Sequence, residues 1–451
     1  MKYNISEIEE KFKVTLDEDQ IEAINSILSF IQHKKGTSIC LSGAAGCGKT
    51  LVLSILHHIL SNNYYHVSSA TPTNKSKVIY SKYSKLPCIT IHNLLGLRPD
   101  VNILNYDASK LLFKPSSKDL FNTQEIIIID ECSMINDQLY DSLIRKALEY
   151  DAIIIWSGDE CQLKPVEQGF ISKTFSNNAV VKLTKVHRQK EGPIGKVLTY
   201  LRKKPLRKFK EVMHDNGSIY MCNNILNMIK KYSYLFKLAS DFEDVSMVKL
   251  VTYTNNRIQA LNEVIRKHIY KGNSEYNYGE ILTGYDQNED ISNSVDYIVK
   301  EIHPHSFRGL NAFKLRLQYN GNESCEVIVL SRVNSDKDFE TLAQHIENLR
   351  QDAIESKSSK AWSKYYSLVG SFQTPVDLVY DNRVIKRKSL DYGYCISAHK
   401  SQSSTYQFVL IDMENIYRCA NDEELRQMQY VALSRTSGDI IIYDKNYDGE
   451  N

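Results

Sequence analysis

The chain has 451 residues, of which 42% are hydrophobic and 24% are charged, the balance of an ordinary globular protein rather than a disordered or membrane one. At roughly 100–200 residues per domain, this length predicts about two to four domains. The formal net charge of +2 excludes a uniformly basic protein but leaves room for a locally basic groove, so charge alone does not decide whether nucleic acid is a partner.

The chain begins with MKYNISEIEEKFKV, which carries acidic residues and no apolar run. No stretch approaches the ~18–20 apolar residues needed to cross a bilayer. The nine cysteines lie far apart, with no C-x-x-C pair and no Cys/His cluster at zinc spacing. We therefore expect a cytoplasmic protein with no membrane contact and no structural metal.

A glycine-rich loop follows the first expected strand, residues 37–42, and precedes an apolar helical stretch. The loop reads GAAGCGKT, the P-loop pattern, whose glycines let backbone N–H groups turn toward phosphates. In such a loop Lys49 reaches the β- and γ-phosphates, and the Thr50 hydroxyl binds Mg²⁺. The sequence therefore predicts a site for ATP and Mg²⁺. The loop residues expected to hold the nucleotide are Gly43, Ala44, Ala45, Gly46, Cys47, Gly48, Lys49 and Thr50.

Two further apolar strands end in polar residues. Residues 125–129 include four consecutive isoleucines, which is typical of a central parallel strand buried on both faces. At its carboxyl end, Asp130 would hold Mg²⁺ through water, and Glu131 would point at the water that attacks the γ-phosphate. Residues 152–156 run into SGDECQLKPV, where Gln162 could contact the γ-phosphate and a neighbouring side chain. Gln162 would then report whether ATP is intact.

In this order, the stretches GAAGCGKT, IIIIDECSM and GDECQLKPV resemble those of a superfamily 1 helicase, and the resemblance extends through nearly the whole chain. The ending YVALSR, residues 430–435, narrows it to the RecD-like and Dda-like branch, superfamily 1B. The resemblance implies an α/β fold with two RecA-like parallel-sheet motor domains. It implies that Gln20, in LDEDQ, reads the adenine edge, and that Arg188, in LTKVHR, and Arg435 reach the γ-phosphate from the second motor domain.

The resemblance also implies a path for DNA. ATPTNK and TIHN would line it on the first motor domain, and HKSQ would grip the phosphate backbone from the second, without sequence preference. The family has glycine after that glutamine, whereas this chain has Ser403. If the turn keeps a positive φ, serine costs about 1 kcal/mol there. The residues expected to contact DNA are Pro72, Thr73, Asn74, His92, Phe113, Thr254, Asn255, His399, Lys400, Ser401 and Gln402.

Two insertions are expected outside these motifs. Residues 98–122 read as strand, turn and strand, which resembles the pin that splits the duplex in this family. Phe113 would stack on the last base pair, a contact worth ~1–3 kcal/mol per base, although a place in the hairpin core remains equally open. Residues 279–391 alternate as a small β-barrel and then show helical spacing, which resembles an SH3-like domain with a helical tower. We interpret Trp362 there as a packing residue. The expected domains are residues 1–178 with the pin, residues 180–277 with 392–451, and residues 279–391.

We therefore expect an ATP-dependent DNA helicase that moves 5′ to 3′ and acts in phage-type replication, recombination or repair. The expected partners are single-stranded DNA and forked or tailed duplex DNA, with a single-stranded-DNA-binding or recombination protein as a further candidate, and the expected state is a monomer. An alternative is a P-loop ATPase that translocates or remodels protein–DNA complexes without processive unwinding. A P-loop kinase would leave TIHN, HKSQ and YVALSR unexplained, and intact Lys49, Asp130, Glu131 and Arg435 argue against a module with a decayed ATP site.

Overall fold

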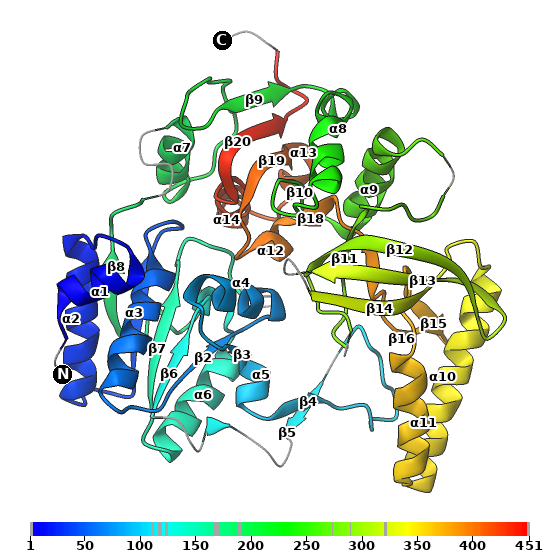
Figure 1. The fold of residues 1–451 in the computed structure, drawn as a ribbon, viewed down its shortest axis with the longest axis horizontal. Helices are drawn as coiled ribbons and strands as arrows, with labels where there is room; N and C mark the ends of the chain where they lie inside the picture. Colours follow the sequence, from blue (N-terminus) through cyan, green and yellow to red (C-terminus); the bar gives the residue numbers. More distant parts are fainter. Residues whose placement is uncertain are drawn as a thin grey trace. The chain divides into compact units, whose positions relative to one another are not determined.

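The computed structural model describes residues 3–110, 112–115, 120–121, 125–165, 171–187, 192–272, 274–288, 290–319 and 323–448 (Figure 1). The chain divides into two compact units. Unit 1 comprises Met1–Arg98, Pro115–Met221 and Ser401–Asn451, and unit 2 comprises Pro99–Lys114 and Cys222–Lys400. Within the described ranges, no helix has the length and apolar character that crossing a membrane requires.

Unit 1 contains a six-stranded parallel sheet with the strand order β3-β2-β6-β7-β1-β8. The strands are β1 (Ser38–Gly43), β2 (Val67–Thr71), β3 (Ile89–Thr90), β6 (Ile126–Ile129), β7 (Ile153–Gly158) and β8 (Ala179–Leu183). The four isoleucines of β6 are buried and pair with strands on both sides, which confirms the expected central strand. The sheet extends beyond residue 178, because β8 pairs with β1.

Helices cover both faces of this sheet because side chains of successive strand residues point to opposite faces. On one face, Leu41, Ile126 and Ile128 pack with apolar residues of the first three helices. On the other face, Ile127 and Trp156 pack with residues of α5 and α6. The helices are α1 (Ile5–Phe12), α2 (Glu18–Gln32), α3 (Lys49–Asn62), α4 (Asn74–Ser84), α5 (Ile91–Leu94) and α6 (Asp137–Glu149), and a short 3₁₀ turn, Cys132–Met134, follows β6.

The C-terminal part of unit 1 contains a second group of buried parallel strands. β19 and β20 pair in parallel, and β9 lies next to β20. The helix α14 is buried over most of its length and contacts α7. These elements are α7 (Pro193–Leu201), β9 (Ile219–Cys222), β19 (Tyr406–Asp412), α13 (Met413–Ile416), α14 (Asp422–Leu433) and β20 (Thr436–Tyr443).

In unit 2, a parallel pair of strands precedes two of the sites expected to bind DNA. β10 (Val248–Thr252) pairs with β18 (Cys395–Ser397) and leads into α9 (Asn255–Ile269), while β18 leads into α12 (Ala398–Ser401). The helix α8 (Ile225–Asp241) packs against α9.

The alternating pattern of residues 281–330 forms strands, as expected. They belong to an antiparallel sheet with the order β14-β13-β12-β11-β17. Next to it in the sequence, two helices lie side by side and pack on the hairpin β15–β16 (Figure 1). These elements are β11 (Ile281–Gly284), β12 (Asp296–Phe307), β13 (Leu310–Tyr319), β14 (Glu323–Leu330), α10 (Asp336–Ser356), α11 (Ser359–Gly370), β15 (Leu378–Tyr380), β16 (Arg383–Lys386) and β17 (Leu390–Tyr392).

The expected strand–turn–strand of residues 98–122 is represented by β4 (Leu97–Pro99) and β5 (Phe113–Pro115), which pair as a two-stranded sheet. The Asp100 N–H donates to the Leu112 carbonyl at 2.7 Å, and Lys114 forms an ion pair with Asp100 at 2.7 Å. The described residues between the two strands, 100–110 and 112, therefore form the loop of the hairpin.

Candidate active site

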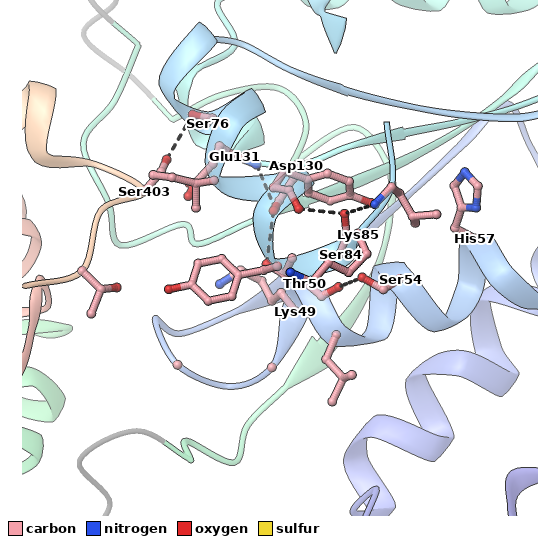
Figure 2. Close-up of a pocket in the computed structure, with 18 of the residues that line it drawn as sticks. Lys49, Thr50, Ser54, His57, Ser76, Ser84, Lys85, Asp130, Glu131 and Ser403 are labelled. Carbon is pink, nitrogen blue, oxygen red and sulfur yellow. Dashed lines mark hydrogen bonds between the residues drawn. The ribbon is translucent and has the colours of Figure 1, made fainter. Parts of the chain in front are cut away.

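The P-loop joins β1 to α3, and its glycines have conformational and steric roles. Gly46 and Gly48 have φ of 83° and 85°, a region that favours glycine. A Cβ on Gly48 would also lie 2.5 Å from the Gln20 side-chain nitrogen. The Lys49 ammonium donates to the carbonyls of Gly43 and Ala44 at 2.8 and 3.1 Å. The loop therefore wraps around its own lysine, and the helix α3 begins at Lys49 (Figure 2).

Gln20 lies against this loop because of the way α2 begins. Asp17 caps the helix, and Gln20 returns the contact by accepting from the Asp17 N–H at 3.2 Å. The Gln20 side-chain nitrogen lies 3.4 Å from the His187 Nε2 atom, and the backbone N–H of His187 donates to the Gly46 carbonyl at 2.9 Å. The segment that carries the LTKVHR motif therefore reaches the P-loop at residue 187. Arg188 itself lies outside the described residues.

Two acidic residues after β6 lie beside the loop, Asp130 buried and Glu131 half-buried. The hydroxyls of Thr50 and Ser157 donate to the Asp130 carboxylate at 3.4 and 2.9 Å. Burial raises the pKa of both Asp130 and Glu131, and the neighbouring Asp130 carboxylate raises that of Glu131 further. The Lys49 cation acts in the opposite direction on both groups.

Arg435 enters the same site from the end of α14. It is 4% exposed and donates to the Ser434 hydroxyl at 2.8 Å and to the Val431 carbonyl at 3.0 Å. Its positive charge is near enough to lower the pKa of Glu131. Gln162, also buried, accepts from the Gln402 side-chain amide at 3.5 Å. One cavity of about 840 Å³ is lined by six of these residues: Lys49, Thr50, Asp130, Glu131, Gln162 and Arg435.

A buried polar cluster beside the P-loop escaped the sequence analysis. The Tyr430 hydroxyl donates to the Asp159 carboxylate at 2.6 Å and accepts from the Ala45 N–H at 3.3 Å. Arg202, on the turn after α7, donates to both Asp159 and Tyr430, at 3.0 and 3.1 Å. Asp159 is fully buried, so its charge requires such partners. The available signal was the acid directly after the buried strand β7, within GDECQLKPV.

The expected DNA-contacting residues of unit 1 lie near the start of α4, in α5 and at the end of α12. Thr73 caps α4, its hydroxyl accepting from the Ser76 N–H at 3.1 Å, with Pro72 and Asn74 on either side in the sequence. Burial lowers the pKa of His92, in α5. The remaining two, Ser401 and Gln402, are buried. DNA contact by these residues stays a prediction.

Ser403 keeps the turn that glycine would favour, as expected, with φ of 66°. Its hydroxyl lies 3.1 Å from that of Ser76, and the two residues face each other in Figure 2.

In unit 2, the remaining HKSQ residues lie beside aromatic rings. His399 stacks on Tyr253, with ring centroids 6.3 Å apart, next in sequence to Thr254 and Asn255 at the start of α9. The Lys400 ammonium lies 3.9 Å from the centroid of the Tyr285 ring, a cation–π contact that the sequence did not reveal. Burial and the nearby cations Lys388 and Arg387 lower the pKa of Lys400 to about 8.

The hairpin presents three large apolar side chains to solvent, those of Leu104, Leu112 and Phe113. Phe113 is 45% exposed and lies in β5, within the paired part of the hairpin. Leu104 is 75% exposed and lies in the loop. Whether Phe113 stacks on a base pair stays a prediction, and Leu104 is a second candidate for that role.

The hairpin loop is held by a buried arginine of α10. Arg350 is fully buried, forms an ion pair with Glu347 at 2.7 Å, and donates to loop carbonyls. The acceptors are the carbonyls of Val101, Ile103 and Leu104, at 3.2, 2.7 and 3.1 Å. Trp362 packs against the apolar side of the same loop, together with Tyr106, so its interpretation as a packing residue is consistent with its surroundings.

Comparisons with known proteins show which family model, which proteins and which solved structure this chain is similar to. An AAA domain family model matches residues 15–224. The chain is 23% identical to an uncharacterized protein of Acanthamoeba polyphaga mimivirus, over 92% of this chain and 96% of that protein. It is 28% identical to the ATP-dependent DNA helicase dda of Enterobacteria phage T4, over 59% of this chain and 60% of that helicase. The solved Pif1 helicase from Candida albicans has a TM-score of 0.54 at 16% identity, with 96% of this chain and 95% of that chain covered.

The fold is that of two RecA-like parallel-sheet domains with a P-loop, as the sequence predicted, and it is shared with a solved helicase. Within that class the chain is similar to Dda and to RecD, helicases of superfamily 1B.

Proposed function

We propose that the chain hydrolyses ATP to move 5′ to 3′ along single-stranded DNA and to unwind the duplex ahead of it. The observation that carries this proposal is the shared cavity. It places the P-loop, both carboxylates, Gln162 and Arg435 around one space of about 840 Å³. These are the parts that phosphoryl transfer requires, because it depends on positioning and on neutralising charge rather than on covalent chemistry.

Each side chain has a role that its geometry allows. The Thr50 hydroxyl and the Asp130 carboxylate are hard oxygen donors next to each other, and they fit Mg²⁺. When bound, the ion would neutralise charge on the phosphates. Lys49 exchanges its loop carbonyls for the β- and γ-phosphates, Glu131 orients the attacking water and accepts its proton, and Arg435 neutralises charge on the γ-phosphate.

The adenine and the γ-phosphate have further contacts. Gln20 lies against the P-loop and reads the adenine edge, with Asp17 holding its carbonyl oxygen. Gln162 senses the γ-phosphate and passes its state to Gln402, with which it is hydrogen-bonded. Arg188 is the second arginine proposed to reach the phosphates.

DNA contact is proposed on both units. Thr73 and its neighbours bind the phosphate backbone from unit 1, and Thr254, Asn255, His399 and Lys400 do so from unit 2. Differences in how tightly these contacts hold in the ATP-bound and ATP-free states would produce a step along the strand. The hairpin, with its loop fixed by Arg350, is the part proposed to separate the duplex.

The proposed partners are single-stranded and forked or tailed duplex DNA, with a single-stranded-DNA-binding or recombination protein beside them. We propose that the chain acts as a monomer in phage-type replication, recombination or repair. The competing function is a translocase that remodels protein–DNA complexes without unwinding.

Strand displacement on duplexes with only a 5′ or only a 3′ single-stranded tail tests this proposal. We expect ATP-dependent displacement with the 5′ tail, and none for Lys49→Ala. Translocation without displacement on either duplex would favour the remodelling ATPase, and preference for the 3′ tail would contradict the polarity. Lys34→Ala is the matched control, because that lysine is exposed and pairs only with exposed Asp151.

A further inference from the structure

A row of hydroxyl groups runs from the start of α4 to the carboxylate of Glu131. The Thr73 and Ser76 hydroxyls are 2.7 Å apart, and the Ser76 and Ser403 hydroxyls are 3.1 Å apart. Ser403 and Glu131 line the same cavity, and hydrogen bonding from the Ser403 hydroxyl lowers the pKa of the Glu131 carboxylate. All four residues belong to unit 1, and Figure 2 shows the last three of them together.

The hydrogen-bonding capacity of these groups gives the row a direction. A hydroxyl has one donor hydrogen and two acceptor lone pairs, whereas an ionised carboxylate only accepts. Ser403 must therefore donate to Glu131, which leaves Ser76 to donate to Ser403 and Thr73 to donate to Ser76. Each group then donates once, and hydrogen bonds in such a chain polarise and strengthen one another.

The position of Ser403 is unusual for a residue with a side chain. Its φ of 66° is a conformation in which glycine is less strained. Glycine would keep the turn but could make neither contact of the hydroxyl. The serine thus accepts backbone strain at the one point where its side chain joins Ser76 to Glu131.

We propose that Ser403 is a positioning residue that couples DNA contact at Thr73 to ATP cleavage by Glu131. This inference rests on the proposed function. A DNA phosphate that accepts the Thr73 hydrogen takes it away from Ser76, and the change passes through Ser403 to the carboxylate that orients the attacking water. The nucleotide site would thereby respond to DNA without a direct contact between DNA and nucleotide.

Ser403→Gly tests the proposal, because it keeps the turn and removes the hydroxyl. We expect DNA-stimulated kcat to fall about fivefold or more, the lower end of typical couplings between sites. KM for ATP should stay within about twofold, since the contacts that bind the nucleotide are unchanged. Ser76→Ala should reduce DNA stimulation as well, and the double variant should lose no more than the more impaired single one.

Two control variants separate the hydroxyl from the backbone. Tyr64 has the same φ of 66° and is 94% exposed, so Tyr64→Gly reproduces only the relief of strain. Ser142→Ala removes an exposed hydroxyl that bonds a carbonyl within α6. Both should retain the DNA stimulation of the unchanged chain.

The failure of this inference can be told from failure of the proposed function. Unchanged DNA stimulation in Ser403→Gly and Ser76→Ala, with Lys49→Ala inactive, would overturn the hydroxyl relay and leave the helicase intact. Additive losses in the double variant would also overturn it. Turnover in Lys49→Ala would instead remove the nucleotide site on which both ideas depend.

Discussion

Lys49 in unit 1 is a half-buried cation and Arg350 in unit 2 is a fully buried one. Both donate to backbone carbonyls, yet they are built for different tasks. Lys49 bonds two carbonyls of its own loop and lines an open cavity, so it can exchange those partners for phosphates. Arg350 is fully buried and bonds three carbonyls almost 250 residues away in sequence. Lys49, which lines the cavity, can therefore take part in ATP hydrolysis, whereas Arg350, which is enclosed, holds the hairpin loop in place.

Among the substitutions that test this difference between the two cations, Arg350→Ala is expected to have the largest effect. It leaves Glu347 buried with only Gln351 and the more distant Arg383 beside it, which should cost about 3 kcal/mol in the free energy of unfolding. The hairpin loop should become sensitive to limited proteolysis, and strand displacement should fall more than ATP turnover.

Arg316→Ala is the control for Arg350→Ala, since it removes an exposed ion pair with Glu301 that is worth about 0–1 kcal/mol. An Arg350 variant whose hairpin resists proteolysis and whose unwinding is unchanged would show that the enclosed cation does not fix the loop.

Phe113→Ala sharpens the description of the hairpin. If the ring stacks on the last base pair, unwinding should slow by about 5- to 150-fold, which corresponds to ~1–3 kcal/mol, while translocation on single strands changes little. The measurement is unwinding and translocation rates on matched substrates.

Leu104→Ala is the companion to Phe113→Ala. Equal slowing of both rates by Phe113→Ala would place the ring in the hairpin core. A larger unwinding defect in Leu104→Ala would assign the wedge to the loop.

The smallest effect is a pH dependence of DNA affinity through Lys400. Its pKa is lowered to about 8, and DNA phosphate binds only the protonated ammonium, so affinity should be full below pH 8 and fall as pH rises through it. Titration of DNA binding against salt should show a slope smaller by about 0.9 at pH 9.

Lys400→Arg should bind DNA equally well at pH 7 and at pH 9, because arginine stays charged. A pH dependence that persists in Lys400→Arg would assign it to another group.

The nucleotide site could be predicted from sequence because its information is local. The P-loop is one contiguous stretch, and the carboxyl ends of parallel strands meet at one edge, which brings Asp130 and Gln162 to the loop. The positive φ at Ser403 was also predictable, because the family motif has glycine there.

What the sequence could not reveal are the contacts between distant residues. Every residue offers a carbonyl, so nothing in the sequence marks Val101 as an acceptor for Arg350. The same holds for Tyr430, whose partner Asp159 is 271 residues away. The contact between Lys400 and the Tyr285 ring was not predictable either, because no sequence pattern around an isolated tyrosine indicates that a cation lies on its ring.

The most direct test of the central claim, that the P-loop and Arg435 serve one ATP site, is the steady-state ATP turnover of Arg435→Ala and Arg435→Lys with saturating single-stranded DNA. The account predicts that both bind ATP, that Arg435→Ala loses about 10³-fold or more in kcat, and that Arg435→Lys retains part of it. Turnover within twofold of the unchanged chain in both variants, with Lys49→Ala inactive, would contradict it.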